Sequence, residues 1–210
     1  MEIKVCGMRD PENIRELIDQ VKPDWMGLIF YPKSPRFVSD QSANQIAGFP
    51  VKKVGVFVNE AESEILKRIK DFDLAAVQLH GQETPEFVES LSKKISAEIW
   101  KVISVQHQID WQSLKSYLPF VSKFLFDTAS SAHGGSGKKF DWKVLETYPF
   151  DKGFLLSGGL DEESVEEISA LAEKLPQLRG VDLNSRFEDA PGMKNIEKLK
   201  FFKKYLDHSK

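Results

Sequence analysis

Short apolar runs alternate with longer amphipathic segments along the whole chain, and this alternation restricts the folds that the sequence can adopt. Apolar runs of this length are typical of buried strands, whereas the segments between them repeat apolar residues at helical spacing. We predict eight strands, at residues 2–6, 25–30, 53–58, 76–80, 99–104, 123–127, 153–157 and 180–183.

Capping residues mark the starts of several predicted helices. Asp10 and Thr84 each precede a proline, which places an N-cap side chain before a proline at the first helical position. We also expect Asn59 and Asp161 to cap the helices after the third and seventh strands. The second, fifth and sixth connections carry weaker helix signals.

Strands that alternate with helices predict parallel βαβ units, and eight such units close into a (β/α)8 TIM barrel. We therefore expect an α/β protein with a single barrel domain over residues 1–210. A doubly wound open sheet is the alternative. That fold would have fewer strands and a GxGxxG turn after the first of them, where this chain has Cys6-Gly7-Met8-Arg9.

Composition narrows the class of partner. Of 210 residues, 41% are hydrophobic and 29% are charged, and the net charge of −3 indicates no basic surface for nucleic acid. No apolar run is long enough to span a bilayer, and no signal-peptide pattern follows the first residues. We therefore expect a cytoplasmic protein with no nucleic-acid or membrane partner, while the oligomeric state stays open.

Polar residues end several of the predicted strands. Cys6 ends the first strand, His80 the fourth and Asp127 the sixth, and Asp182 lies in the eighth. In a (β/α)8 barrel the carboxyl ends of the strands meet on one face, where the chemistry of such barrels is placed. A thiol, an imidazole and a carboxyl group there could transfer protons. The alternatives are ordinary caps and loop residues, and for Cys6, the only cysteine, an inert buried side chain.

The segments after the last two strands predict an anion site. Gly158 and Gly159 lie between the seventh strand and Asp161, and Ser185 and Arg186 follow the eighth strand. Loops at these positions form the recurrent phosphate site of such barrels, with backbone N–H groups and a helix N-terminus facing the anion. In isolation the two glycines could form a tight turn, but their position favours a phosphorylated small molecule as the ligand.

Two further segments could contact a ligand. The glycine-rich loop 133–142 matches neither the Walker A nor the dinucleotide pattern, and could be a flexible lid or a second anion site. Arg36 follows the second strand, and its planar guanidinium suits a carboxylate. A surface arginine with no partner is the alternative.

Taken together, these motifs resemble those of the phosphoribosylanthranilate isomerase family and occur in the same order. The segments that carry the resemblance are Lys4-Val5-Cys6-Gly7-Met8-Arg9, Gly27-Leu28-Ile29-Phe30, Ser34-Pro35-Arg36, Val54-Gly55-Val56-Phe57, Val77-Gln78-Leu79-His80-Gly81, Phe126-Asp127, Gly134-Gly135-Ser136-Gly137, Phe140-Asp141-Trp142, Ser157-Gly158-Gly159-Leu160 and Pro191-Gly192-Met193-Lys194. The resemblance implies an enzyme of tryptophan biosynthesis. It would convert N-(5-phosphoribosyl)anthranilate into 1-(2-carboxyphenylamino)-1-deoxyribulose 5-phosphate by an Amadori rearrangement, with no cofactor and no metal.

The resemblance also implies roles for single residues. Asp127 takes the place of the general acid and Cys6 that of the general base, while Arg36 would bind the anthranilate carboxylate. Asp182 would orient the anthranilate end, and we expect His80 to support the site rather than to catalyse. The phosphate would be bound by Gly158, Gly159, Ser185 and Arg186.

The sequence leaves open how Cys6 is ionised and how Arg186 replaces the glycine that the family usually has. An unperturbed cysteine has a pKa of about 8.5, so a thiolate at neutral pH needs a nearby cation such as Lys4 or Arg9. Where the family usually carries Ser-Ser-Gly, this chain has Asn184-Ser185-Arg186. Arg186 therefore either has an unusual backbone conformation or adds a charged clamp on the phosphate.

Other phosphate-binding barrels are the remaining alternatives. The histidine-pathway isomerase performs the same rearrangement with paired aspartates and would want an aspartate in place of Cys6. Indole-glycerol-phosphate synthase would want a lysine and a glutamate, and is longer. A non-catalytic phosphate-binding protein would need neither Cys6 nor Asp127. The four histidines have no HxxxH or HxH spacing, so we expect no metal site.

Overall fold

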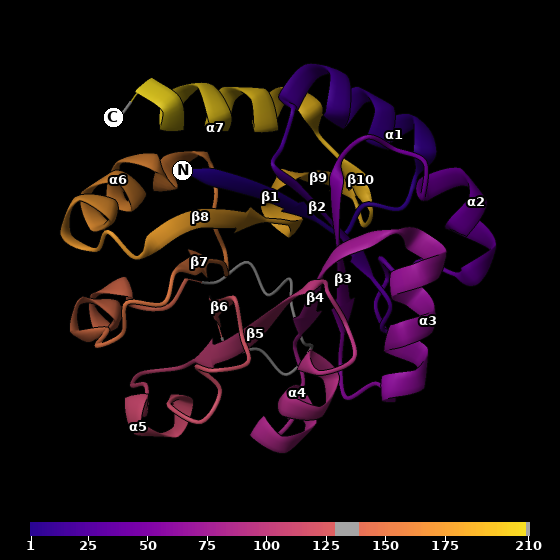
Figure 1. Ribbon diagram of the computed structural model, residues 1–210. Coiled ribbons are helices and arrows are strands. Elements are labelled where there is room, and N and C mark those ends of the chain that lie inside the picture. The colour runs from indigo at the N-terminus through magenta and orange to yellow at the C-terminus, as the bar shows by residue number, and fades with distance from the viewer. Residues whose placement is uncertain (129–138, 209–210) are drawn as a thin grey trace.

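The protein is a closed barrel of eight parallel strands with helices around it (Figure 1). The structure is a computed structural model and describes residues 1–128 and 139–208. The strands are β1 (Glu2–Cys6), β2 (Trp25–Ile29), β3 (Lys52–Phe57), β4 (Leu74–Leu79), β5 (Glu98–Val105), β6 (Lys123–Thr128), β7 (Phe154–Leu156) and β8 (Leu178–Leu183). Each strand pairs with the next and β8 pairs with β1, which confirms the predicted barrel and excludes the open sheet.

Helical segments of very different length connect the strands. The α-helices are α1 (Pro11–Glu16), α2 (Ala43–Ile46), α3 (Glu62–Phe72), α4 (Pro85–Ser92), α5 (Trp111–Leu114), α6 (Val165–Lys174) and α7 (Ile196–His208). The π-helical turn η1 (Leu17–Val21) extends α1, and the 3-10 segments are η2 (Asp40–Ser42), η3 (Trp142–Thr147), η4 (Glu162–Ser164) and η5 (Ser185–Phe187). The short α2, α5 and η3 occupy the three connections with the weaker helix signals.

Three of the four predicted caps are confirmed. Asp10 accepts hydrogen bonds from the first turn of α1, Thr84 accepts one from the first turn of α4, and Asp161 forms a capping box with Ser164 ahead of α6. The prediction for Asn59 is wrong, because α3 starts three residues later. Asn59 instead has a φ of 51° and accepts a hydrogen bond from the Gln82 amide at 2.6 Å, so its side chain ties together the loops after β3 and β4.

The core has two parts. A large cluster lies between the barrel and the helices, and a second, smaller cluster fills the inside of the barrel. The inner cluster is made of Trp25, Val54, Ala76, Trp100, Val102, Leu125 and Leu155. Its two indole rings, 4.8 Å apart, meet edge to face. Because these side chains occupy the interior below the strand ends, a ligand can enter only from the carboxyl end of the barrel.

A short hairpin that the sequence analysis did not predict follows β8. Its strands β9 (Glu188–Ala190) and β10 (Met193–Lys194) pair antiparallel and place Lys194 in the interior. Asn13 on α1 fixes this hairpin, since its side-chain amide donates to the Lys194 carbonyl oxygen at 3.0 Å and accepts from the Lys194 amide at 2.7 Å.

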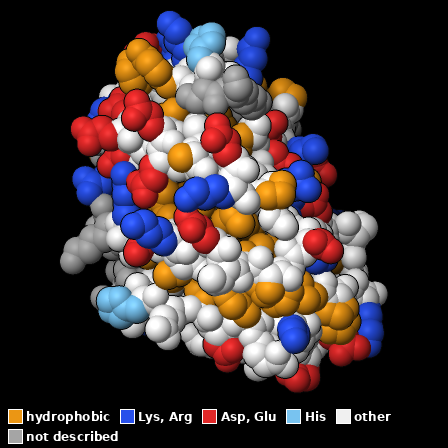
Figure 2. Space-filling model, turned by 90° about the vertical axis from the view of Figure 1, so that its left-hand side faces the viewer, with side chains coloured by type: hydrophobic (Ala, Val, Ile, Leu, Met, Phe, Trp, Pro, Cys, Tyr) orange, Lys and Arg blue, Asp and Glu red, His pale blue; other side chains and the backbone are white. Residues whose placement is uncertain are grey.

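The charged side chains of both signs are mixed on the surface. On the face drawn in Figure 2, lysine and arginine alternate with aspartate and glutamate, and no area of one sign stands out. The apolar side of α7 is buried, as its spacing predicts. Within residues 1–128 and 139–208, no helix is long and apolar enough to cross a membrane.

Candidate active site

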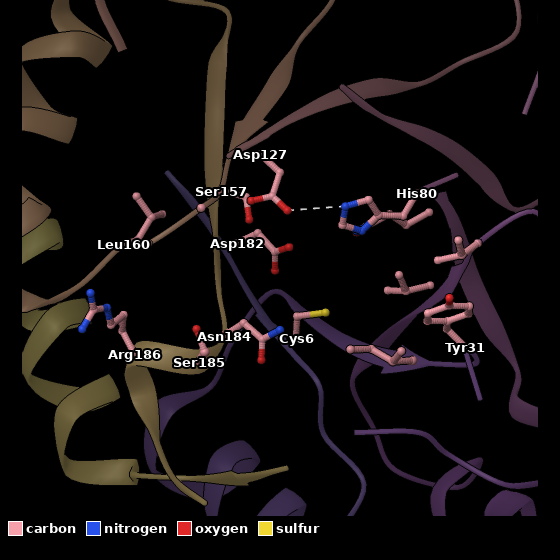
Figure 3. A pocket seen from close by; sticks show the side chains of 16 residues that line it. Cys6, Tyr31, His80, Asp127, Ser157, Leu160, Asp182, Asn184, Ser185 and Arg186 are labelled. Atoms are coloured by element: carbon pink, nitrogen blue, oxygen red, sulfur yellow. Dashed lines mark ion pairs between the residues drawn. The ribbon is translucent and has the colours of Figure 1, made fainter. Parts of the chain in front are cut away.

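A cavity opens at the carboxyl end of the barrel and collects almost all of the predicted site residues (Figure 3). Its lining consists of Cys6, Ile29, Tyr31, Val56, Val58, Gln78, His80, Asp127, Ser157, Gly158, Gly159, Leu160, Asp182, Asn184, Ser185 and Arg186. Of the nine residues proposed from sequence, only Arg36 is missing from this lining.

Cys6 ends β1 and points into the cavity (Figure 3). It is 3% exposed and lies opposite Gly27 of β2 in the register of the two strands. A Cβ atom at position 27 would lie 2.7 Å from the Cys6 Sγ, so only glycine leaves room for the thiol in this orientation.

A buried ion pair lies beside the thiol. Lys4 and Asp182 are paired in the β1–β8 register, and the Lys4 Nζ donates to the Asp182 Oδ1 at 2.8 Å. Burial lowers the pKa of Lys4, but the Asp182 carboxylate and Cys6 outweigh burial and hold that pKa above its usual value. Burial, with a smaller contribution from Asp127, raises the pKa of Asp182 against the effect of Lys4. The lysine is therefore a persistent positive charge next to Cys6.

Two cations act on Cys6, and burial opposes them. Burial raises the pKa of the Cys6 thiol, with a further increase from Asp182, whereas Lys4 and Lys194 lower it. The net pKa lies above the ordinary value for cysteine. Arg9, the other cation considered from sequence, instead donates to the Pro35 carbonyl oxygen at 3.1 Å.

Asp127 and His80 both line the cavity and contact each other. The His80 Nε2 lies 3.4 Å from the Asp127 Oδ2, and both side chains are about nine-tenths buried (Figure 3). The His80 amide donates to the Phe57 carbonyl oxygen at 2.8 Å, which fixes the end of β4 against β3. The imidazole therefore contacts the carboxyl group that the family resemblance identifies as the general acid.

Gly158 brings the loop after β7 into contact with Asp127. It has a φ of 88°, and a Cβ atom there would lie 2.3 Å from the Thr128 Oγ1 and 2.8 Å from the Asp127 Oδ1. Gly159 also has a positive φ, of 69°. The two glycines thus form a compact turn directly beside the carboxyl group, which side chains at these positions would disrupt.

The segment after β8 also lines the cavity. Ser185 and Arg186 line the cavity in η5, and the exposed Arg186 lies on the same side as Leu160 in Figure 3, away from Cys6. Arg186 does not have a positive φ. Of the two possibilities for this departure from the family pattern, an unusual backbone conformation is therefore wrong.

Arg36 has a carboxylate partner within the protein. Its Nε and Nη2 donate to both carboxylate oxygens of Glu188, and the shortest of these distances is 2.6 Å from Nη2 to Oε2. Lys194 also contacts Glu188, and donates to the Asn184 Oδ1 at 2.9 Å. The alternative of a surface arginine without a partner is wrong, because the side chain is only 11% exposed and paired.

Charge and burial compete in this second cluster. Burial would raise the pKa of Glu188, but the hydrogen bonds from Arg36 and the charge of Lys194 hold it below its usual value. Burial lowers the pKa of Lys194 to about 8, against the effect of Glu188. Lys194 therefore loses part of its charge near neutral pH, in contrast to Lys4.

Sequence reasoning missed several lining residues because it considered mainly strand ends and the loops that follow them. Residues two positions apart on a strand point to the same face. Applied to His80, this rule would have placed Gln78 in the cavity. Glu188 and Lys194 lie beyond the last strand of the barrel, on the hairpin β9–β10, where spacing along the chain gives no sign of their contact with Arg36.

Most of the glycine-rich loop after β6 lies outside the described residues, including His133, Gly134, Gly135, Ser136, Gly137 and Lys138. At its end, Phe140 is buried and Asp141 caps η3. Among the described residues, no group of three or more His, Cys, Asp or Glu side chains is arranged to hold a metal ion.

Comparison with known proteins agrees with the fold and identifies the family. Residues 3–204 match the family model described as N-(5'-phosphoribosyl)anthranilate (PRA) isomerase. The chain is 46% identical over 195 residues to N-(5'-phosphoribosyl)anthranilate isomerase of Phocaeicola vulgatus, covering 93% of this chain and 92% of that protein. The crystal structure of phosphoribosyl anthranilate isomerase from Thermotoga maritima superimposes with a TM-score of 0.85 at 33% identity, covering 99% of both chains. A structure of such an isomerase in complex with reduced 1-(o-carboxyphenylamino)-1-deoxyribulose 5-phosphate gives a TM-score of 0.82 at 30% identity, again over 99% of both chains.

The fold and these relatives define a (β/α)8-barrel isomerase. More narrowly, the chain belongs to the N-(5'-phosphoribosyl)anthranilate isomerase family. Its activity is the isomerisation of N-(5'-phosphoribosyl)anthranilate in tryptophan biosynthesis.

The crowded turn at Gly158 yields a test of the site geometry. In Gly158→Ala the methyl group meets Thr128 and Asp127 and the positive φ becomes strained, so we expect kcat/KM to fall roughly ten- to a hundredfold. Gly48→Ala is the matched control, because a Cβ there meets nothing within 4 Å. Steady-state kinetics on both variants checks this, and equal activity of the two would contradict the described geometry.

Proposed function

We propose that the isomerisation proceeds by general acid–base catalysis, with Asp127 as the acid and Cys6 as the base. The observation that carries this proposal is the convergence of a buried thiol and a buried carboxyl group on one cavity, beside a double-glycine turn. The barrel scaffold alone would not require either group in a simple binding protein.

The two ends of the cavity suit the two ends of the substrate. Gly158, Gly159, Ser185 and Arg186 supply backbone amides, a hydroxyl and a guanidinium at one end, which suit a phosphate. Ile29, Tyr31, Val56 and Val58 supply apolar surface, which suits the aromatic ring of an anthranilate. The ribosyl carbon atoms that react would then lie between these ends, next to Cys6 and Asp127.

The chemistry follows from this placement. Asp127 delivers a proton to the ring oxygen as the bond from that oxygen to C1 breaks, and the nitrogen lone pair forms a C1=N double bond. The resulting cation acidifies the C2 hydrogen. The Cys6 thiolate removes this hydrogen as a proton. The electron pair of the broken C2–H bond forms C1=C2, and the electrons of the C1=N double bond return to the nitrogen, which becomes neutral. The enolamine then loses its C2 hydroxyl proton and gains a proton at C1, which gives the ketone with no change in overall composition.

Cations near Cys6 favour the thiolate that the proposed mechanism needs, while burial opposes them. The ammonium groups of Lys4 and Lys194 favour negative charge on Cys6. Asp182 would therefore act on the base indirectly, by holding Lys4 beside Cys6, in addition to any contact with the anthranilate end.

Arg36 remains the proposed partner of the anthranilate carboxylate, in a modified form. In the structure its guanidinium is bound by Glu188, and its side chain packs against the site of Gly7, where a Cβ would lie 2.6 Å from the Arg36 Cδ. We propose that Glu188 holds the guanidinium in place and balances its charge until the substrate carboxylate binds beside it.

The roles of Cys6 and Asp127 can be separated from folding. We expect Cys6→Ser and Asp127→Asn each to lower kcat by roughly 100-fold or more while the thermal unfolding midpoint stays close to that of the parent. The assay generates phosphoribosylanthranilate in situ and follows its disappearance. Full activity in both variants would overturn the mechanism, because neither group could then transfer the proton.

The protonation of Cys6 can be read directly, because it is the only cysteine. Its pKa is raised, mainly by burial. Forming the reactive thiolate therefore takes a higher pH than it does for an ordinary thiol. We expect the rate of alkylation by iodoacetamide, followed by mass spectrometry, to keep increasing above about pH 8.5. A rate that levels off below pH 7 would contradict a raised pKa.

Arg186 should act on binding rather than on chemistry. If its guanidinium clamps the phosphate, Arg186→Gly should raise KM about tenfold and leave kcat nearly unchanged, since the phosphate does not change during the reaction. An unchanged KM would show that the backbone amides and Ser185 suffice.

A further inference from the structure

Gln78 is a buried polar side chain in the cavity that the mechanism leaves unused. It lies on β4 two residues before His80, on the same face of the strand, and is 2% exposed. Its side chain lines the cavity, and its Oε1 is fully buried. Within residues 1–128 and 139–208, this oxygen has no hydrogen-bond partner.

The strands next to Gln78 offer its side-chain amide few hydrogen-bond partners. Its register neighbours are Val56 on β3 and Trp100 on β5. The Trp100 Nε1, the polar atom of that pair of side chains, donates to the Glu98 Oε2 at 2.7 Å. A buried amide oxygen without a hydrogen bond costs free energy, and an apolar side chain of similar shape would fill the space without that cost. The remaining open direction for the amide is the cavity.

We propose that the Gln78 amide binds the ribosyl C2 oxygen of the substrate, an inference that rests on the function proposed above. Gln78 lines the same cavity as Gly158 at the proposed phosphate end and Tyr31 at the apolar end. During the rearrangement this oxygen changes from a hydroxyl, which donates, to a carbonyl, which only accepts. A neutral amide offers an acceptor and a donor, so it can bind both forms without changing its own protonation.

The neutrality of glutamine also fits its surroundings. The charged and titratable groups near the proposed reacting centre include Lys4, Cys6, His80, Asp127, Asp182 and Lys194. A carboxylate at position 78 would add negative charge beside Asp127 and Cys6 and oppose formation of the thiolate. An amide supplies hydrogen bonds without disturbing that balance.

The test exploits the opposite effects expected on stability and on activity. In Gln78→Met we expect an unfolding midpoint equal to or above that of the parent, together with a fall in kcat/KM of at least about tenfold, mainly in kcat. In Gln78→Glu we expect a larger fall in kcat. The inhibition constant of inorganic phosphate should be unchanged in both variants, because the phosphate end lies away from position 78.

Gln177 provides the matched control. Its Oε1 is also buried without a partner within the described residues, but it is absent from the cavity lining. Gln177→Met should therefore change the unfolding midpoint in the same direction and leave kcat/KM unchanged. A merely structural Gln78 would behave like Gln177 in activity, or would lose stability in Gln78→Met, and either result would overturn the proposal.

The outcome can be assigned to one proposal or the other. Turnover by the parent, with its loss in Cys6→Ser, supports the proposed acid–base function independently of Gln78. If Gln78→Met then keeps kcat/KM within about twofold of the parent, only the role of Gln78 fails. If Cys6→Ser stays fully active, the mechanism itself fails, whatever Gln78→Met does.

Discussion

The pairing of β8 with β1 closes the barrel, and the architecture of the site depends on it. This pairing sets Lys4 opposite Asp182 at 2.8 Å, in an interior where neither charge could remain alone. The same closure brings the loops after β7 and β8 next to the end of β1. Cys6, the double-glycine turn and Ser185 therefore share one cavity although they come from opposite ends of the chain. An open sheet of the same strands would leave the thiol far from the acid.

The site balances buried charges in two linked clusters. Lys4 and Asp182 form one, and Arg36, Glu188 and Lys194 form the other, which also contacts Asn184. Both contain cations that lower the pKa of Cys6, yet burial raises it further than they lower it. A thiol with a raised pKa is a stronger base once it is ionised, which suits the removal of a proton from carbon. The cost is that the thiolate is scarce before substrate binds.

Particular residues show how far sequence patterns reach. The order of strands and the caps at Asp10, Thr84 and Asp161 follow from local chemistry, and the structure confirms them. The prediction that Asn59 caps a helix is wrong because the partner of its side chain, the Gln82 amide, lies 23 residues away along the chain. The pairing of Arg36 with Glu188 joins residues 152 positions apart, on a hairpin with no strong strand signal. Strand alternation could have predicted that Gln78 faces the cavity. It could not have predicted that the Gln78 Oε1 has no hydrogen-bond partner among the described residues.

The sequence by itself determined the alternation of strands and helices, and hence the barrel and the set of residues at its carboxyl end, because these depend on periodicity and on the order of elements along the chain. The resemblance of its motifs pointed to the correct family. Only the tertiary structure decided which charges meet, that Arg186 keeps an ordinary backbone conformation, and that burial raises the pKa of Cys6 despite two neighbouring cations. These properties depend on distance and on exclusion of water, which arise only when distant segments pack together.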